Sequence, residues 1–329
     1  MRRNKRVNRM RIIDFHCDTL MKMYDLHKVG DDSQSVWKNE CQIDVQRLVE
    51  AGYGAQFFAC YLWWEDKPFL ASHYEDALNM ADIFYKGLQG HEKQAAFAGS
   101  YTEYLKNKEE GKVSCFLTVE EGGILENKIE RLDTLHKKGI RMITLTWNYE
   151  NCLGYPGCIP EARDKGLKPF GFEALERMEE LGIIADVSHL SDGGFEDIYR
   201  HCKRPFIASH SDARAVCAHN RNLTDDMLKK LADKGGVTGL NFCGDFLSPD
   251  GKCTIDAMLR HIRHMINVGG REVVAIGTDF DGVEGELEIA GCQYMDKLPE
   301  AMEKAGFTIG EIEDVCFRNA EKFMERYWG

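Results

Sequence analysis

Short apolar runs recur along the chain, and most are followed by a segment whose apolar residues are spaced three or four positions apart. About eight of the runs are strand candidates, and most of these are apolar on both faces, as buried parallel strands are. The segments between them have the period of amphipathic helices, and several end in Gly, which is common at helix C-termini. The predicted strands cover residues 11–16, 54–62, 113–120, 141–147, 183–189, 205–210, 236–242 and 273–279. The predicted helices cover residues 74–88, 172–182, 225–235, 255–270, 297–305 and 308–326.

This alternation of strands and helices predicts a parallel sheet with helices on its outside. Eight repeats in 329 residues favour a closed (β/α)8 barrel, the TIM-type α/β fold, over an open doubly wound sheet. The open sheet is the weaker alternative, partly because no GxGxxG motif follows any predicted strand. We expect residues 11–329 to form one barrel domain, and the basic residues 1–10 to form a disordered leader.

The charge balance argues against several kinds of partner. A net charge of −12 does not suit nucleic acid or an anionic membrane surface. No apolar run approaches the roughly 18 residues that cross a bilayer, and the basic start of the chain is too short and polar for a secretory signal. We therefore expect a cytoplasmic protein that is not attached to a membrane.

The twelve cysteines are scattered, contain no CxxC pair and often lie inside apolar runs. This spacing gives little support to a zinc finger or a disulfide scaffold. We expect mostly buried, reduced thiols that pack as small apolar side chains. Cys152 and Cys158 could pair in an oxidising setting, although nothing in the sequence requires it.

Ionisable side chains stand at the ends of five predicted strands, where an apolar strand more often ends in Gly, Pro or Asn. Barrel active sites are built at the C-terminal ends of the strands, so these side chains should converge on one cavity. The residues are His16 and Asp18, Glu120 and Glu121, His189, His210, and Asp279.

The types of these residues predict a metal site. Neutral imidazole and carboxylate are the ligands of a catalytic zinc ion that keeps an open position for water. The donor set exceeds what one tetrahedral zinc ion needs, which predicts two metal ions bridged by a carboxylate. No Lys stands at these strand ends, so a glutamate is the natural bridge. Glu120, which continues its strand, is favoured over Glu121, which begins the turn EGG, but both stay open.

Five motifs, HCD, VEEGG, DVSH, SHSDARAVCAHNRN and GTDFDG, occur in this order. Together they resemble the membrane (renal-type) dipeptidase family of zinc peptidases, from about residue 11 to the C-terminus. The resemblance implies a soluble, bacterial-type member with a (β/α)8 barrel, a binuclear zinc site and a homodimeric assembly.

The resemblance also implies individual roles. His16 and Asp18 would bind one zinc ion, His189 and His210 the other, and Glu120 would bridge the two. Asp279 would hold the attacking water and act as general acid and base. Arg221 would clamp the carboxylate of the substrate.

One motif departs from the family. Where the family commonly has LTH at the end of the fourth of these strands, this sequence reads LTWN, with Trp147 and Asn148. The family's histidine is associated with binding the polarised peptide oxygen. Trp147 and Asn148 are therefore the candidates for substrate contact at this position, and Asn148 could replace the histidine as a donor.

Several of the neighbouring residues have a plainer alternative. Arg221 could pair with Asp225 or Asp226 on the surface. His261 and His264 lie three positions apart on a predicted outer helix, where we expect an exposed helix surface rather than a metal site.

The main functional hypothesis is a zinc-dependent dipeptidase. It would hydrolyse small dipeptides that have a free C-terminal carboxylate, including those with a D-residue at that position, through a metal-bridging hydroxide. One alternative keeps the barrel and both metals but acts on a cyclic amide, a lactone or a phosphoester. The HxD motif, in place of HxH, and the lack of a bridging Lys count against it. Another alternative is a barrel that only binds ligands, which the full set of metal ligands disfavours.

Overall fold

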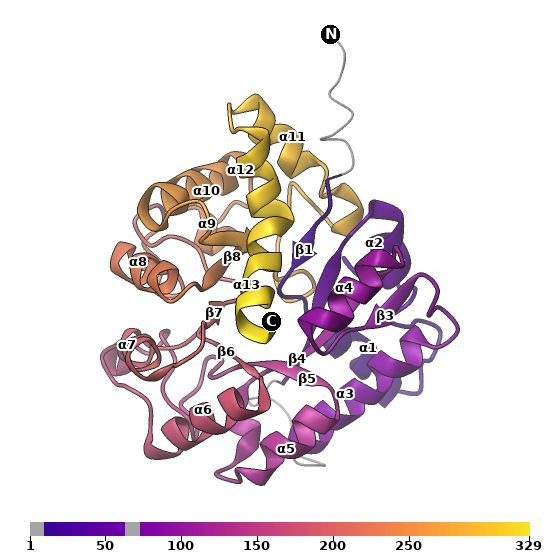
Figure 1. Ribbon diagram of the computed structural model, residues 1–329, viewed down its shortest axis with the longest axis horizontal. Helices are drawn as coiled ribbons and strands as arrows, with labels where there is room; N and C mark the ends of the chain where they lie inside the picture. The colour runs from indigo at the N-terminus through magenta and orange to yellow at the C-terminus, as the bar shows by residue number, and fades with distance from the viewer. Residues whose placement is uncertain (1–9, 63–72) are drawn as a thin grey trace.

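Eight parallel strands close into a barrel in the computed structural model, which describes residues 10–62 and 73–329 (Figure 1). Going round the barrel, the order is β1, β2, β4, β5, β6, β7, β8 and β9. Asp14 of β1 pairs with Ile276 of β9, and this pairing closes the ring. The strands are β1 (Ile13–Asp14), β2 (Ala55–Tyr61), β4 (Val113–Glu120), β5 (Ile140–Thr144), β6 (Ile184–Asp186), β7 (Ile207–Ala208), β8 (Val237–Leu240) and β9 (Val274–Ile276).

All eight barrel strands lie where the apolar runs predict them, so the (β/α)8 fold is confirmed. A further strand, β3 (Ala95–Phe97), was not predicted. It pairs in parallel with residues 113–115 at the start of β4, whereas β5 pairs with β4 only from Leu117 onward. A three-residue strand carries too short an apolar pattern to be recognised in the sequence.

Helices surround the barrel in Figure 1 and connect its strands. They are α1 (Thr19–Lys28), α2 (Val45–Ala51), α3 (His73–Leu88), α4 (Tyr101–Glu109), α5 (Glu130–Lys137), α6 (Pro169–Leu181), α7 (Asp192–His201), α8 (Asp225–Asp233), α9 (Gly244–Leu247), α10 (Ile255–Gly269), α11 (Lys297–Lys304), α12 (Ile309–Glu313) and α13 (Asn319–Trp328). Among the described helices, none is long and apolar enough to cross a bilayer.

The longer amphipathic helices confirm the sequence prediction, with one difference at the C-terminus. The segment predicted as one helix, 308–326, is divided into α12 and α13 by a π-helical turn over Asp314–Arg318. Helices α1, α2, α4, α5 and α7 and the single turn α9 were not predicted. Each has ten residues or fewer and buries only two to four of them, so few apolar positions are available from which to recognise a helix.

The last helix closes the N-terminal end of the barrel. Phe323 of α13 packs edge-on against Phe15, with ring centroids 5.9 Å apart. The Tyr327 hydroxyl donates to the carbonyl of Ile183, just before β6, at 2.6 Å. Figure 1 shows α13 lying across the middle of the barrel. With this end filled by apolar side chains, the opposite, C-terminal end of the strands is the one free to carry a site.

The expected leader, residues 1–10, lies outside the described residues except for Met10, whose side chain is buried. That leader and the single-domain boundary at residue 11 therefore stay predictions.

Candidate metal centre and active site

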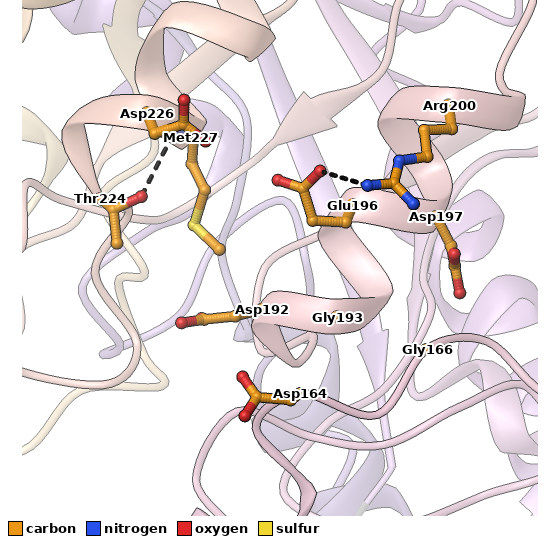
Figure 2. Close-up of a pocket in the computed structure, with 10 residues that line it drawn as sticks. All are labelled: Asp164, Gly166, Asp192, Gly193, Glu196, Asp197, Arg200, Thr224, Asp226 and Met227. Atoms are coloured by element: carbon orange, nitrogen blue, oxygen red, sulfur yellow. Dashed lines mark hydrogen bonds and ion pairs between the residues drawn. The ribbon is translucent and has the colours of Figure 1, made fainter.

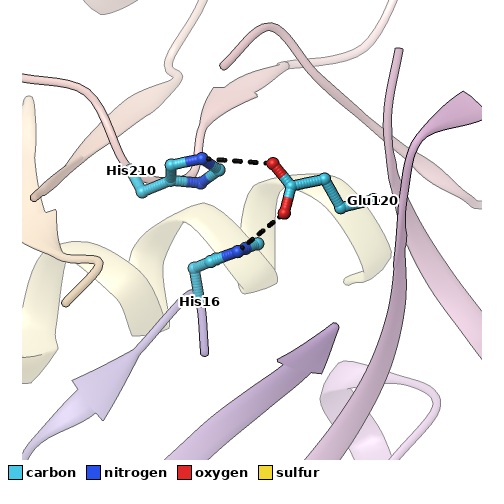
Figure 3. A group of neighbouring side chains, drawn as sticks. All are labelled: His16, Glu120 and His210. Carbon is cyan, nitrogen blue, oxygen red and sulfur yellow. Dashed lines mark ion pairs between the residues drawn. The ribbon is translucent and has the colours of Figure 1, made fainter. Parts of the chain in front are cut away.

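Four side chains from different strand ends meet at the C-terminal mouth of the barrel. His16 follows β1, Glu120 ends β4, His189 follows β6 and His210 follows β7. Glu120 Oε2 lies 3.1 Å from His16 Nε2, and Glu120 Oε1 lies 2.9 Å from His189 Nε2 and 3.5 Å from His210 Nε2. Figure 3 shows the two oxygens of Glu120 turned toward different histidines, His16 and His210. The structure thus brings together residues spread over nearly two hundred positions of sequence.

Two aspartates join this cluster on the side of His16. Pairing between the ends of β1 and β9 continues past the strands, since the Asp18 N–H donates to Phe280 O at 2.9 Å and the Asp279 N–H donates to His16 O at 3.2 Å. Asp18 Oδ1 and Asp279 Oδ1 consequently lie 3.5 Å and 3.7 Å from His16 Nε2. His16, Asp18 and Asp279 each offer a ligand atom, and these atoms lie within 4.8 Å of one another.

The polar atoms of this cluster are better suited to coordinate a metal ion than to form hydrogen bonds with one another. Among the described residues, both ring nitrogens of His16, Asp18 Oδ1 and Glu120 Oε1 are buried without a hydrogen-bond partner. Buried polar atoms in proteins nearly always have partners, so several unsatisfied atoms in one place need an explanation. Imidazole nitrogens and carboxylate oxygens that converge at short distances are the donor set of a metal centre.

The charges of the cluster also favour a bound metal ion. Burial alone would raise the pKa of Glu120, but the charge of His16 and the close imidazoles of His16, His189 and His210 outweigh burial and hold that pKa well below its usual range. Burial raises the pKa of Asp279 to about 7. The negative charges of Asp18 and Glu120 raise this pKa further, whereas the charge of His16 lowers it. Several carboxylates crowded into a buried space repel one another, and a bound cation would relieve this repulsion.

Arg221 lies beside the histidines and not at the surface. Its side chain is buried, and it donates from Nη1 to Ser211 Oγ and from Nη2 to His210 O, each at 3.3 Å. The alternative pairing with Asp225 or Asp226 is wrong, because Asp225 pairs with His264 and Asp226 with Lys230. Within the described part of the chain, no carboxylate lies within ion-pair distance of Arg221. A buried guanidinium without a carboxylate partner is suited to bind an anionic group.

Trp147 and Asn148 follow β5 on the other side of His189. The indole ring of Trp147 lies 5.2 Å from the ring of Tyr61 and 6.1 Å from that of His189, measured between centroids. Asn148 Oδ1 lies 3.0 Å from His189 Nδ1. Both residues therefore flank the cluster, where we predict contact with substrate.

Comparison with known proteins decides the family. The family model of the membrane dipeptidases, peptidase family M19, matches residues 1–327. The chain belongs to this family. An uncharacterised dipeptidase of Schizosaccharomyces pombe is 29% identical over 302 residues, which are 86% of this chain and 71% of that protein. The fold, the family and the ligand-rich strand ends agree on a metal-dependent dipeptidase.

Two solved structures of metallopeptidases have the same fold over nearly their whole length. Dipeptidase AC, a metallopeptidase of this family, is 26% identical with a TM-score of 0.89, covering 98% of this chain and 99% of that one. A metallopeptidase from Rhodobacter sphaeroides, solved with a phosphinate mimic of the dipeptide L-Ala-D-Ala, is 25% identical with a TM-score of 0.88. The match covers 97% of this chain and 99% of that one.

In this M19 chain, buried aspartates one layer below the ligands fix the strand ends. Asp14 accepts hydrogen bonds from the Thr278 N–H at 2.9 Å, from Thr278 Oγ1 at 2.7 Å and from the His16 N–H at 3.2 Å. It thus joins β1 to β9 directly below His16 and Asp279. The sequence signal was available, because Asp14 interrupts the apolar run IIDFH two positions before His16.

Asp186 has the same function for His210. It accepts hydrogen bonds from Thr144 Oγ1 and Ser209 Oγ, each at 2.6 Å, and from the N–H groups of Ser188 and Ser209 at 3.0 and 2.8 Å. Since the Ser209 hydroxyl donates to Asp186, it accepts from His210 Nδ1, which lies 2.7 Å away. The neutral His210 ring then has its lone pair on Nε2, facing Glu120 and free to bind a metal.

Asn241 orients Asp279 in a similar way. Its side-chain NH2 donates to Asp279 Oδ2 at 2.9 Å and to His210 O at 3.2 Å, while its Oδ1 accepts from the Cys243 N–H at 2.6 Å. Asp279 Oδ1 is left facing His16. Asn241 was missed in the sequence because an Asn at the end of an apolar run reads as an ordinary turn residue.

Three of the five described non-glycine residues with a positive φ lie at or beside this cluster. His189, Asp279 and Asp281 have φ values of 68°, 61° and 72°, in the left-handed region that non-glycine residues seldom adopt. Such residues cluster at functional sites, where the surrounding structure holds them in place. The side chains of His189 and Asp279 lie in the cluster, whereas Asp281 accepts hydrogen bonds from Thr19 Oγ1 and the Gln42 N–H.

A separate hollow of about 460 Å³ lies on the surface between α7 and α8 (Figure 2). Five of its ten lining residues are acidic, among them Asp192, Glu196 and Asp197 of α7 and Asp226 of α8. None of the candidate metal ligands lines it, so we assign it no function.

One histidine differs from its prediction. His264 lies on the helix surface as expected, but His261 is fully buried. Its Nδ1 accepts from the Ala213 N–H at 3.1 Å and its Nε2 lies 3.0 Å from Leu247 O. The helix face that carries His261 turns inward because the loops that hold Ala213 and Leu247 cover it.

Proposed function

We propose that this chain is a zinc-dependent dipeptidase that hydrolyses dipeptides with a free C-terminal carboxylate, including those with a D-residue at that position. The observation that carries the proposal is the meeting of His16, Glu120, His189 and His210 at one mouth of the barrel. Membership of a dipeptidase family supports the reaction type.

The donor geometry supports two metal ions. His16 and Asp18 would hold one zinc ion, and His189 and His210 the other. Glu120 would bridge them, since its two carboxylate oxygens are directed to different histidines. When bound, the pair of zinc ions would lower the pKa of a water held between them and polarise the peptide carbonyl.

Asp279 is the candidate for proton transfer. Asn241 holds its Oδ2, and its Oδ1 faces His16 in the cluster, where it would be available to the attacking water. Asp279 would take the proton of that water and deliver it to the leaving amine.

Arg221 is the candidate for substrate recognition. Its buried guanidinium would pair with the C-terminal carboxylate, and a substrate without this charge would leave the guanidinium unpaired. Trp147 and Asn148 would contact the substrate from the opposite side. Acceptance of a D-residue is supported by the Rhodobacter relative, which was solved with a mimic of L-Ala-D-Ala.

A substrate panel combined with elemental analysis tests the proposal. We expect about two zinc ions per chain and turnover of L-Ala-L-Ala and L-Ala-D-Ala. The C-terminal amide of each dipeptide should react at least about 10-fold more slowly, because a charged hydrogen-bonded pair contributes about 1.5–3 kcal/mol. Turnover of lactones or phosphotriesters without turnover of dipeptides would instead favour the wider class of binuclear amidohydrolases.

A cytoplasmic location and a homodimeric state are further parts of the proposal. The acidic charge balance and the family resemblance support them. Cell fractionation and light scattering of the purified protein test them separately from the catalytic proposal.

A further inference from the structure

The loop after β5 is held to the end of β4 by one carboxylate. Glu121 Oε2 accepts from the Trp147 N–H at 2.6 Å, and its Oε1 accepts from the Gly123 N–H at 2.5 Å and from the side chain of Asn151. Asn151 also donates to Leu145 O at 2.8 Å. These bonds fix the residues on both sides of Asn148, so the position of its side chain relative to the barrel is well determined.

From this loop, Asn148 reaches the outer nitrogen of His189. Asn148 Oδ1 lies 3.0 Å from His189 Nδ1, and the thiol of Cys158 lies 3.5 Å from the backbone oxygen of Asn148. The His189 ring is buried, and its backbone has a φ of 68°. A side chain on such a strained turn needs a partner to fix the direction of its ring.

The chemistry of the contact decides which nitrogen carries the proton. A carboxamide oxygen can only accept, so His189 Nδ1 donates to it and Nε2 of the neutral ring is left with a lone pair. This assignment agrees with the other side of the ring. Nε2 lies 2.9 Å from Glu120 Oε1 and 3.1 Å from His210 Nε2. His210 Nε2 also carries a lone pair, because its Nδ1 donates to Ser209, so two lone pairs and a carboxylate oxygen converge where a cation would be their common partner. The bare nitrogen is therefore directed into the cluster.

We propose that Asn148 is a positioning residue of the metal centre. Its carboxamide oxygen holds His189 in the tautomer and orientation that direct Nε2 to a metal ion, and Glu121 holds the loop that carries Asn148. The inference rests on the proposed metal-dependent function and deepens it. In this proposal Asn148 accepts a hydrogen bond from His189 Nδ1, just as Ser209 accepts one from His210 Nδ1. The proposal also assigns a function to one residue of the pair Trp147–Asn148, which replaces the family's LTH motif. The NH2 of Asn148 is left for the substrate contact proposed above.

Metal binding, measured apart from activity, tests this proposal. The wild type is compared with Asn148→Ala, which removes the acceptor, Asn148→Asp, which keeps one, and Glu150→Gln. Glu150 lies in the same loop, is exposed and pairs with Lys168, so its variant controls for a general disturbance of the loop. Zinc affinity of the stripped proteins is measured by competition with a chromogenic chelator. The visible spectrum of the Co2+ form reports ligand geometry.

For Asn148→Ala we expect one of the two zinc-binding steps to weaken by about 10- to 100-fold, as for other outer partners of metal-bound histidines, with the other step unchanged. The Co2+ spectrum should change in the same variant. Asn148→Asp should restore the affinity to within about 3-fold of wild type, and Glu150→Gln should match wild type. If Asn148→Ala does not fold, Asn148→Ser, whose hydroxyl is too short to reach the ring, takes its place.

Three results would overturn the proposal. Zinc affinities of Asn148→Ala within about 2-fold of wild type at both steps, in a wild type that binds zinc and cleaves dipeptides, would remove this role of Asn148 and leave the proposed function intact. Equal weakening of both steps without rescue by Asn148→Asp would indicate a disturbed loop and not a lost acceptor. A wild type that binds no zinc would remove the proposed function together with this inference.

Discussion

Glu120 and Glu121 are consecutive residues, but their carboxylates face different partners. Glu120 lies among His16, His189 and His210. Glu121 instead accepts hydrogen bonds from the backbone N–H groups of Gly123 and Trp147. Successive residues at a strand end point to opposite sides, so only one of the two can face the cluster. In this structure that residue is Glu120.

The two glutamates should therefore respond differently to the same substitution. Glu120→Gln removes a proposed bridging ligand, so we expect loss of at least one zinc ion and a fall in activity of more than about 100-fold, beyond the effect of an outer partner. Glu121→Gln should keep both metal ions but lower the free energy of unfolding by about 1–3 kcal/mol, because a buried acceptor loses part of its bonding. Elemental analysis and denaturant unfolding measure the two effects. Equal metal loss in both variants would contradict this division.

Asp279→Asn should separate metal binding from proton transfer. An amide cannot accept the proton of the attacking water, so we expect turnover to fall by about 100- to 10,000-fold while the zinc content stays that of the wild type. Steady-state kinetics and elemental analysis on the same preparation check this. A variant with a normal rate would remove Asp279 from the mechanism.

Arg221→Met should change selectivity more than the chemistry. Loss of a charged hydrogen-bonding partner of the substrate carboxylate is expected to lower kcat/KM for L-Ala-D-Ala by about 10- to 100-fold. The C-terminal amide of the same dipeptide is the internal control, since it has no charge for Arg221 to bind. Equal losses on both substrates would show that Arg221 does not recognise the carboxylate.

His261 should make stability depend on pH in acid. Burial lowers its pKa to about 4, below the usual value of 6.5, so the unfolded chain binds a proton in this range that the folded chain does not. The contribution of His261 is present above pH 6.5 and is lost as pH falls toward 4. It amounts to about 2 kcal/mol between pH 7.5 and pH 5.

His261→Gln removes this titration, so the variant should lose less unfolding free energy between these two pH values than the wild type. Metal-free protein is used for both, so that titration of the ligand histidines affects them equally. Identical pH dependence in the two proteins would contradict the assignment.

The sequence predicted the parts of the molecule that depend on repeated patterns. Eight apolar runs, most of them apolar on both faces, identified the barrel strands. Barrel topology then placed His16, Glu120, His189, His210 and Asp279 at one mouth without any knowledge of the loops. A chain that alternates buried strands with amphipathic helices has few other ways to bury both faces of its sheet.

What the sequence did not reveal depends on local conformation. The contact between Asn148 and His189 exists because of a particular loop path that Glu121 fixes, and no spacing rule indicates it. The pairing of β3 with the start of β4 and the inward direction of His261 likewise depend on neighbours that are remote in sequence. The roles of Asp14 and Asp186 could have been predicted from the sequence, because a charged residue inside an apolar strand needs a buried partner.

Helix α13 closes the N-terminal end of the barrel, where Phe323 and Tyr327 fill the end opposite to the candidate metal ligands. A dipeptide must then enter, and the two amino acids released from it must leave, through the same opening at the C-terminal end of the barrel. Each turnover ends only when the products have left by the route through which the next substrate arrives. Free amino acids at high concentration should accordingly slow the enzyme by competing for that passage.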